Sequence, residues 1–478
     1  MNIFKYSAIE LNKSFVKGLI SAEDIVIAYI NKIINEDKYG AFLYIAKEEA
    51  IEAAKELDKK RKNGANLGRL AGVPIAVKDN ISVKGMPMTC ASHILENYIA
   101  PYDATVIEKI KEEDGIIIGK TNMDEFAMGS SGMNSAFKAI KNPIDVTKSS
   151  GGSSGGSAVA VATNMAPLSL GSDTGGSVRQ PASFCGIIGF KPGYGKISRY
   201  GLTAFSSTLD TIGIFGRNLG DIKLLYDCLA AEDDKDQTSF KCNKANNYLE
   251  FNKDNKKLIY IKEMLEYCSK DMKEKFIKYK EVLWEKGMDI EEISLPEIKY
   301  SLPAYYVLSS AEASSNLARF DGVKYGMSLR EVKDINNIYK LTRSKGFGEE
   351  VKRRIIVGNY ILSKEDKKGY FEKALAVKEN IKRAFKEILD DNTAIISPCT
   401  TDIAFNIHDH KNVTEFYGMD QLTVPANLAG VPAISIPISY INGMPIGVQI
   451  ITSQHSENML LECAKVIEQS KVVINYER

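Results

Sequence analysis

Two clusters rich in glycine and serine constrain this sequence more than any other feature. Residues 149–157 read SSGGSSGGS and residues 171–177 read GSDTGGS. A flexible Gly/Ser linker has no reason to lead directly into apolar structure. Here the first cluster leads into the compact apolar run 158–162, which predicts a helix, and then into 167–170, which predicts a short buried strand. We therefore expect both clusters to form tight loops at the ends of buried elements.

The pattern around these clusters predicts an α/β fold. Short β-branched runs such as 73–77 and 116–118 alternate with helical stretches and Gly/Ser clusters, as is typical of a largely buried sheet with helices on both faces. Strand-like runs return near the end of the chain, at 394–396, 433–436 and 446–451. Because strands from distant segments can share one sheet, we expect a mixed central β-sheet covered by helices on both faces.

The 478 residues are expected to form a single domain, 1–478, with four segments. They are N-terminal helices in 1–62, a core with the Gly/Ser loops in 63–230, a loop and helical insertion in 231–391, and returning strands with a C-terminal helix in 392–478. Apolar spacing predicts the first helices at 8–36 and 45–62. The polar stretch 232–257 predicts a surface loop.

Charge and cysteine content narrow the function classes. The 62 Lys and Arg residues are balanced by 61 Asp and Glu residues, which leaves a net charge of +1. This balance argues against a chain that itself holds nucleic-acid phosphates, although a partner could do so. Seven scattered cysteines without a C-x-x-C pair favour the reducing cytoplasm. We expect neither a signal peptide nor a membrane-spanning segment.

A Gly-rich loop can cradle phosphate or hold a nucleophilic hydroxyl beside N–H donors. The segment most similar to a phosphate-binding loop motif is 114–121. It is one residue shorter than the motif, has Asp114 in place of the first glycine, and contains isoleucines that predict a strand. A nucleophilic serine needs a base, and none of the four histidines lies in an apolar or Gly-rich setting. The segment His408-Asp409-His410 has no third ligand nearby, so no metal site is expected.

Lys78 is the best candidate for the base because it ends the apolar run 73–77. To act near neutral pH, its ammonium must lose about three pK units from a free value of ~10.4. This shift costs about 4 kcal/mol, which burial at the end of a strand can supply. An ordinary solvated lysine after a strand is the alternative interpretation.

Lys78, Ser153 and Ser177 follow one another at a spacing that resembles the amidase signature family. The resemblance implies a Ser-cisSer-Lys triad on a mixed sheet. Ser177 is then the nucleophile, Ser153 in a cis peptide relays the proton, and Lys78 is the base, while Ser154 is structural. The resemblance also implies an oxyanion hole made by the backbone N–H groups of Thr174, Gly175, Gly176 and Ser177.

Further segments resemble one branch of this family, the A subunits of tRNA-dependent amidotransferases. These segments are 122–129, 312–322, 346–355 and 423–430. The resemblance implies that Arg354 and Asp420 bind the carboxylate and the amino group of free glutamine, with Gly129 and Tyr305 nearby. A zwitterionic substrate needs one fixed charge of each sign. Residues 407–419 depart from the usual pattern of the branch.

The resemblance implies a glutaminase subunit that forms an acyl-enzyme on Ser177 and passes ammonia to a partner. The ammonia converts Glu-tRNA(Gln) to Gln-tRNA(Gln), or Asp-tRNA(Asn) to Asn-tRNA(Asn). No cofactor is expected on this chain, because a B subunit uses ATP and Mg²⁺ and makes most contacts with tRNA. A small wrapping C subunit is also implied. A stand-alone amidase acting on another small amide and an inactive scaffold are the alternatives.

Overall fold

The computed structural model describes residues 2–240, 257–329, 331–332, 334–363, 369–409 and 412–469. Most of the predicted surface loop at 232–257, and His410 of the segment discussed above, therefore lie outside the described residues. Within these ranges, none of the helices combines the length and the apolar character needed to cross a bilayer.

Eleven strands form one sheet in the order β1-β3-β2-β4-β6-β5-β10-β11-β9-β7-β8. Their bounds are β1 Phe42–Ile45, β2 Pro74–Lys78, β3 Ile116–Thr121, β4 Leu168–Asp173, β5 Ile188–Lys191, β6 Thr211–Gly216, β7 Lys257–Ile261, β8 Ile290–Ile293, β9 Thr393–Pro398, β10 Ala433–Ile441 and β11 Met444–Ile451. Strand β2 is parallel to its neighbours β3 and β4, whereas β4, β6, β5, β10 and β11 pair antiparallel. Distant segments thus share one mixed sheet, as predicted.

The helices include the predicted N-terminal ones. Their bounds are α1 Ala8–Val16, α2 Ala22–Glu36, α3 Lys47–Lys62, α4 Thr105–Glu112, α5 Gly155–Ala162, α6 Arg179–Cys185, α7 Leu219–Leu229, α8 Lys262–Glu266, α9 Lys270–Glu285, α10 Ser301–Asn316, α11 Ile335–Gly346, α12 Glu349–Ile361, α13 Tyr370–Ile388, α14 Val413–Gly418, α15 Val424–Ala429 and α16 Glu457–Gln469. The stretch 8–36 forms two helices because Ser7 and Ser21 each cap a new helix by accepting an N–H bond.

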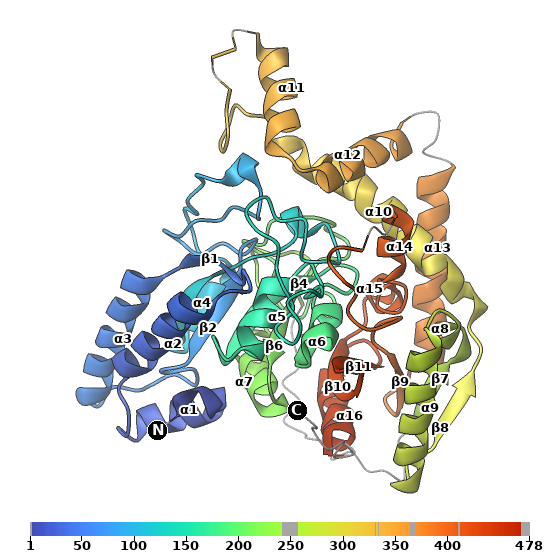
Figure 1. The fold of residues 1–478 in the computed structure, drawn as a ribbon, viewed down its shortest axis with the longest axis horizontal. Coiled ribbons are helices and arrows are strands. Elements are labelled where there is room, and N and C mark those ends of the chain that lie inside the picture. The colour runs from blue at the N-terminus through green and yellow to red at the C-terminus, as the bar shows by residue number, and fades with distance from the viewer. Residues whose placement is uncertain are drawn as a thin grey trace.

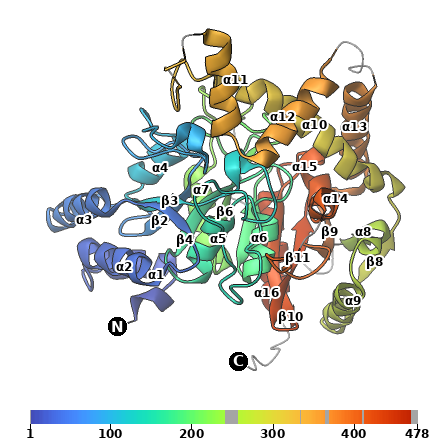
Figure 2. The ribbon, with the colours of Figure 1, turned by 45° about the horizontal axis from the view of Figure 1, so that its top comes forward.

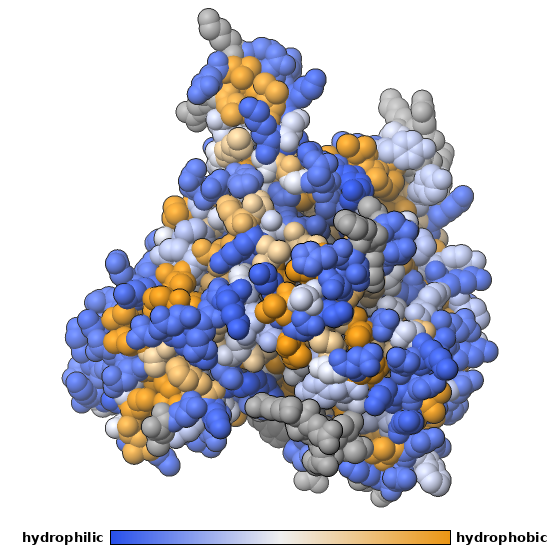
Figure 3. All heavy atoms as spheres, viewed as in Figure 1, coloured by the Kyte–Doolittle hydropathy of each residue, from blue (hydrophilic) through white to orange (hydrophobic). Residues whose placement is uncertain are grey.

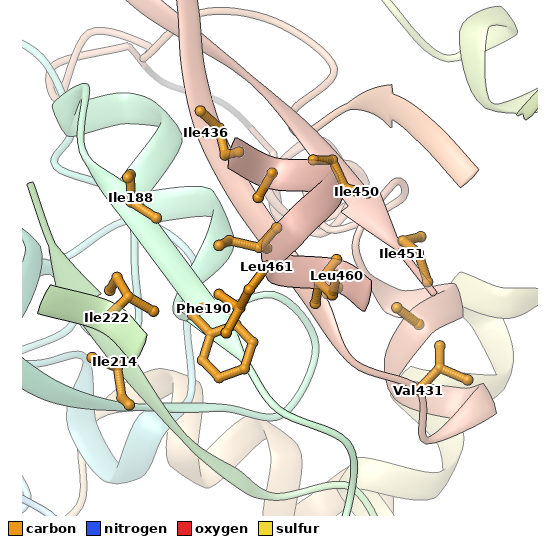
Figure 4. Packing of buried hydrophobic residues seen from close by; sticks show 14 of the residues in the cluster. Ile188, Phe190, Ile214, Ile222, Val431, Ile436, Ile450, Ile451, Leu460 and Leu461 are labelled. Atoms are coloured by element: carbon orange, nitrogen blue, oxygen red, sulfur yellow. The ribbon is translucent and has the colours of Figure 1, made fainter. Parts of the chain in front are cut away.

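Helices cover both faces of the sheet because successive strand residues point to opposite sides. In β3, Ile117 joins the hydrophobic cluster that includes α4, α7 and α16, while Ile116 and Ile118 join the cluster that includes α1, α2, α3 and α5. Figure 4 shows part of the first cluster, where Leu460 and Leu461 of α16 lie beside the sheet. The predicted fold class is confirmed.

The predicted helical insertion also contains two strands. Strand β7 pairs in parallel with β8 and with β9, so both strands extend the sheet. In β8, Glu291 and Glu292 are exposed, and charged residues are common on edge strands because they discourage further pairing. The sequence pattern predicts a mostly helical segment here and does not predict these two strands.

Helices α10 to α13 lie together on one side of the molecule, at the top of Figures 1 and 2, with α11 outermost. Helices α10 and α12 pack against each other. Figure 3, seen from the same side as Figure 1, shows an apolar patch on α11 among hydrophilic residues; Ile335 of this helix is exposed.

Candidate functional site

The candidate site lies where two parallel strands end. Lys78 is the last residue of β2 and Asp173 is the last residue of its parallel neighbour β4. Because parallel strands present their carboxyl ends at the same edge of a sheet, the loops that follow them meet there. The second Gly/Ser cluster begins in β4 and continues into this edge, and the first cluster packs against it through a bond from the Ser154 N–H to the Ser177 carbonyl, 3.2 Å long.

Three serine hydroxyls surround the Lys78 side chain, which is completely buried. Its Nζ lies 2.8 Å from the Oγ atoms of Ser153, Ser154 and Ser172. Burial lowers the pKa of Lys78 to about 7, although the nearby carboxylate of Asp124 acts in the opposite direction. A lysine with this pKa is half in the neutral form near pH 7, and only the neutral form can accept a proton.

Ser153 is bonded to this lysine, and Ser177 is joined through its backbone to Ser154, another neighbour of the lysine. The peptide bond between Gly152 and Ser153 is cis, as the resemblance implies. A Cβ atom at Gly152 would lie 1.9 Å from Oδ2 of Asp124, so no larger residue fits there. Ser177 is almost buried, and its backbone carbonyl accepts the N–H of Ser154. The structure thus brings the Lys78 and Ser153 side chains into contact and holds Ser177 next to them through its backbone.

The loop after β4 wraps around the buried carboxylate of Asp173. This carboxylate accepts the N–H groups of Gly176 at 2.8 Å and Val178 at 3.2 Å, and it pairs with Arg179 at 3.0 Å. Burial alone would raise the pKa of Asp173, but Arg179 brings it to about 2, so the carboxylate stays ionised. Gly176 has a φ of 135°, and a Cβ atom there would lie 2.1 Å from Oγ1 of Thr423.

The predicted oxyanion hole differs from the structure at Gly176. Its N–H donates to the buried carboxylate described above and is therefore already occupied. The hydroxyl of Thr174 donates to Asp210 at 2.7 Å, which anchors the start of the loop. The N–H groups of Thr174, Gly175 and Ser177 remain the predicted donors from this set.

Arg354 and Asp420 form a second, charged part of the site, and Tyr306 connects them. The Arg354 guanidinium lies 4.5 Å from the centre of the Tyr306 ring, and the Tyr306 hydroxyl donates to Asp420 at 2.9 Å. Ser130 also donates to Asp420. Burial raises the pKa of Asp420 to about 6, against the opposing effect of these bonds. Among the residues that the structure describes, Nη1 of buried Arg354 has no hydrogen-bond partner.

Gly129 and Tyr305 link the two parts of the site. Tyr305 packs against the loop after β4, since a Cβ atom at Gly175 would lie 2.6 Å from the Tyr305 ring. On its other side, the ring of Tyr305 lies 5.0 Å from that of Tyr306. Gly129 has a φ of 148° and precedes Ser130. All four predicted binding residues thus lie near one another or near the serine cluster.

Four neighbours of the charged pair are not among the predicted residues: Ser130, Tyr306, Glu350 and Tyr417. Glu350 accepts from Nε of Arg354 at 2.7 Å and from the hydroxyl of Tyr417 at 2.8 Å. The ring of Tyr417 stacks on that of Tyr306 with centroids 4.0 Å apart. Tyr417 belongs to α14, inside the divergent segment 407–419. That segment therefore still supplies a side chain to the charged part of the site.

Comparison with known proteins agrees with this arrangement. A family model described as Amidase matches residues 24–461. The chain is 50% identical over 475 residues to an A subunit of glutamyl-tRNA(Gln) amidotransferase from Clostridium acetobutylicum, with 98% of each chain covered. It is 48% identical over 472 residues to the A subunit of the same kind of enzyme from Fusobacterium nucleatum, covering 98% of this chain and 97% of that one.

Among solved structures, the A subunit of glutamyl-tRNA(Gln) amidotransferase from Thermotoga maritima superposes with a TM-score of 0.81 at 37% identity, covering 98% of this chain and 95% of that one. An amidase of known structure superposes with a TM-score of 0.83 at 25% identity, covering 98% of this chain and 100% of that one. The resemblance inferred from the two Gly/Ser clusters is confirmed, and the chain belongs to the amidase family.

Proposed function

We propose that this chain is the glutamine-hydrolysing A subunit of a tRNA-dependent amidotransferase. The observation that carries the proposal is the buried Lys78 bonded to Ser153 beside Ser177, with the charges of Arg354 and Asp420 close by. The first part of this arrangement can cleave an amide, and the second can hold an amino acid. The relatives with full-length similarity carry the name of such a subunit.

In the proposed reaction, Ser177 attacks the carboxamide carbon of glutamine while its proton passes through Ser153 to neutral Lys78. The backbone N–H groups of Thr174, Gly175 and Ser177 stabilise the oxyanion. The intermediate then expels ammonia, which takes the proton back through Ser153, and a γ-glutamyl ester remains on Ser177. Water attacks this ester by the same route in reverse, which releases glutamate and restores the serine.

Glutamine fits the charged part of the site because it carries one charge of each sign. Its carboxylate pairs with Arg354, whose unpartnered Nη1 supplies a donor, and its ammonium pairs with Asp420. Nε of Arg354 pairs with Glu350, but its buried Nη1 has no partner among the described residues. Buried donors and charges are costly without partners, so a zwitterion suits this part of the site better than an apolar amide does. Tyr305 lies between this pair and the Gly175 loop, where the side chain of glutamine would extend.

We further propose that this chain works with a B subunit that uses ATP and Mg²⁺ and holds tRNA, and with a small C subunit. The relatives are named as subunits, the net charge is only +1, and the string nearest to a phosphate-binding loop forms β3 instead. A chain with this charge is poorly suited to holding tRNA alone. The scattered cysteines favour a cytoplasmic location.

The proposal is tested by transamidation with two nitrogen donors. The complex of this chain with its B and C subunits should amidate Glu-tRNA(Gln) or Asp-tRNA(Asn) with either glutamine or ammonium. A complex containing Ser177→Ala should use ammonium at the wild-type rate but should not use glutamine, because it lacks only the step that generates ammonia. If Ser177→Ala blocks both donors equally, or if this chain alone amidates charged tRNA, the division of labour is different.

If Arg354 and Asp420 select glutamine as the substrate, removing either charge should affect glutamine more than an uncharged amide. Arg354→Ala and Asp420→Ala should each lower kcat/KM for glutamine by roughly 10- to 150-fold, since one charge-assisted contact contributes about 1.5–3 kcal/mol. Hydrolysis of propionamide, which carries neither charge, should change much less. The measurement is ammonia release from both amides by the same preparations. Equal losses on the two substrates would favour a stand-alone amidase or a folding defect.

A further inference from the structure

The surroundings of Lys78 contain more polar groups than the proposed reaction uses. A neutral lysine has two N–H bonds and one lone pair, yet three hydroxyl oxygens lie at 2.8 Å from Nζ. To take a proton from Ser153, the lone pair must point at that residue. The other two hydroxyls, those of Ser154 and Ser172, are then the nearest acceptors for the two N–H bonds, because the only further acceptor among the described residues, the Ser172 backbone carbonyl, is more distant at 3.4 Å.

Ser154 can only accept from Lys78. Its own hydroxyl donates to the backbone carbonyl of Ser172 at 3.0 Å, and its oxygen also accepts the Ser172 N–H at 3.2 Å. The proton of Ser154 is therefore directed away from the lysine. One of the two N–H bonds of neutral Lys78 is fixed by this contact.

The Ser172 hydroxyl can either donate to Lys78 or accept from it. The orientation of the Asn80 amide decides between the two. The amide of Asn80 lies 3.0 Å from the Ser172 Oγ, to which Nδ2 donates, while the buried Oδ1 has no hydrogen-bond partner in the described ranges. With Nδ2 at Ser172, the serine proton is free to point at the lone pair of Lys78. A half-turn of the amide brings Oδ1 to Ser172, where it accepts this proton, and moves Nδ2 to the position that Oδ1 now occupies.

We propose that Asn80 and Ser172 are positioning residues that orient the lone pair of Lys78 toward Ser153. In this arrangement Asn80 Oδ1 accepts the Ser172 proton, and the Ser172 oxygen accepts the second N–H of the lysine. The assignment rests on the proposed serine–lysine chemistry, but it does not depend on glutamine being the substrate. It gives Ser172, which belongs to strand β4, a role beyond the three predicted catalytic residues.

The test uses a reaction that reports on Ser177 without glutamine. The second-order rate of Ser177 sulfonylation by phenylmethylsulfonyl fluoride is followed by intact mass across the neutral pH range. Ser172→Ala should lower the plateau rate on the order of tenfold, a part of the roughly 10²–10⁴-fold effect of general base catalysis. The acid limb of the profile should also move to lower pH, because the lysine ammonium loses one acceptor and deprotonates more easily.

The matched control is Ser169→Ala. Ser169 lies on the same strand, is equally buried, and donates to the Ser157 carbonyl at 2.8 Å. This control should keep the wild-type plateau and acid limb. Asn80→Ala should slow sulfonylation as well, and the Ser172→Ala/Asn80→Ala double variant should be no slower than Ser172→Ala, since Asn80 acts through Ser172.

Three outcomes would overturn the assignment: an unchanged profile in Ser172→Ala, an equal loss in Ser169→Ala, or losses that multiply in the double variant. Failure of the proposed function looks different. If the wild-type protein is sulfonylated at Ser177 but releases no ammonia from glutamine, glutamine is not its substrate. The variants above still test the orientation of Lys78 in that case.

Discussion

Ser177→Ala should give a folded protein that no longer hydrolyses glutamine, with a loss of at least about 10³-fold in kcat. The expected loss is this large because removing a nucleophile removes the acyl-enzyme route as a whole, not one contact within it. The fold should survive, since the bond from the Ser154 N–H ends on the backbone carbonyl of residue 177, which alanine retains. Ammonia release in the presence of saturating glutamine measures the effect.

A buried serine on the following helix supplies the control for this variant. Ser183 lies in α6 and accepts the N–H of Gly447 at 2.9 Å. Ser183→Ala should lose some thermal stability while it retains most of its kcat. If Ser177→Ala keeps more than about a tenth of the wild-type rate, another group is the nucleophile.

The proposed catalytic residues could be picked out from the sequence because they lie in local patterns. The two Gly/Ser clusters mark loops where side chains do not fit, and the structure shows why at Gly152, whose Cβ would meet Asp124. Lys78 ends an apolar run, and the structure buries it at the end of β2. The order of strands β2 and β4, which brings the loops together, could not be read from these patterns.

The charged part of the site is only partly predictable. Asp420 follows from the resemblance, but Tyr306, which joins it to Arg354, carries no signal of its own. Glu350 lies in the first turn of α12, where an acidic residue is usually a solvated helix-capping charge. Contacts of this kind depend on the packing of α10, α12 and α14, and such long-range packing is not encoded in a short window of sequence.

One segment of the insertion forms a strand although its residues are common in helices. The segment 290–293 reads IEEI, and glutamate pairs are common in helices. In the structure it forms β8, which pairs with β7; Ile290 is buried, and Glu291 and Glu292 are exposed. Four residues are too few to separate a period of 2 from a period of 3.6. The strand is therefore defined by its partner β7 and not by its own sequence.

Lys78→Arg should be as inactive as Ser177→Ala, although it keeps a positive charge. A base must be able to lose its proton, and a guanidinium does not do so in proteins. In the wild type, burial lowers the pKa of Lys78 to about 7, and the neutral form predominates above that value. The rate of glutamine hydrolysis should therefore rise with pH through about 7 and then level off. Steady-state rates across this range, with the wild type and the arginine variant, measure both effects.

A larger guanidinium in a fully buried position can also disturb folding, so Lys78→Met provides the matched variant. Methionine has a similar length, carries no charge, and needs no hydrogen bonds from the serine cluster, so it suits the buried position. Its melting temperature should be close to that of the wild type while activity remains lost. Activity in either variant would show that another group removes the proton. A wild-type rate that stays constant from well below pH 7 would show that Lys78 is already neutral there or does not act as the base.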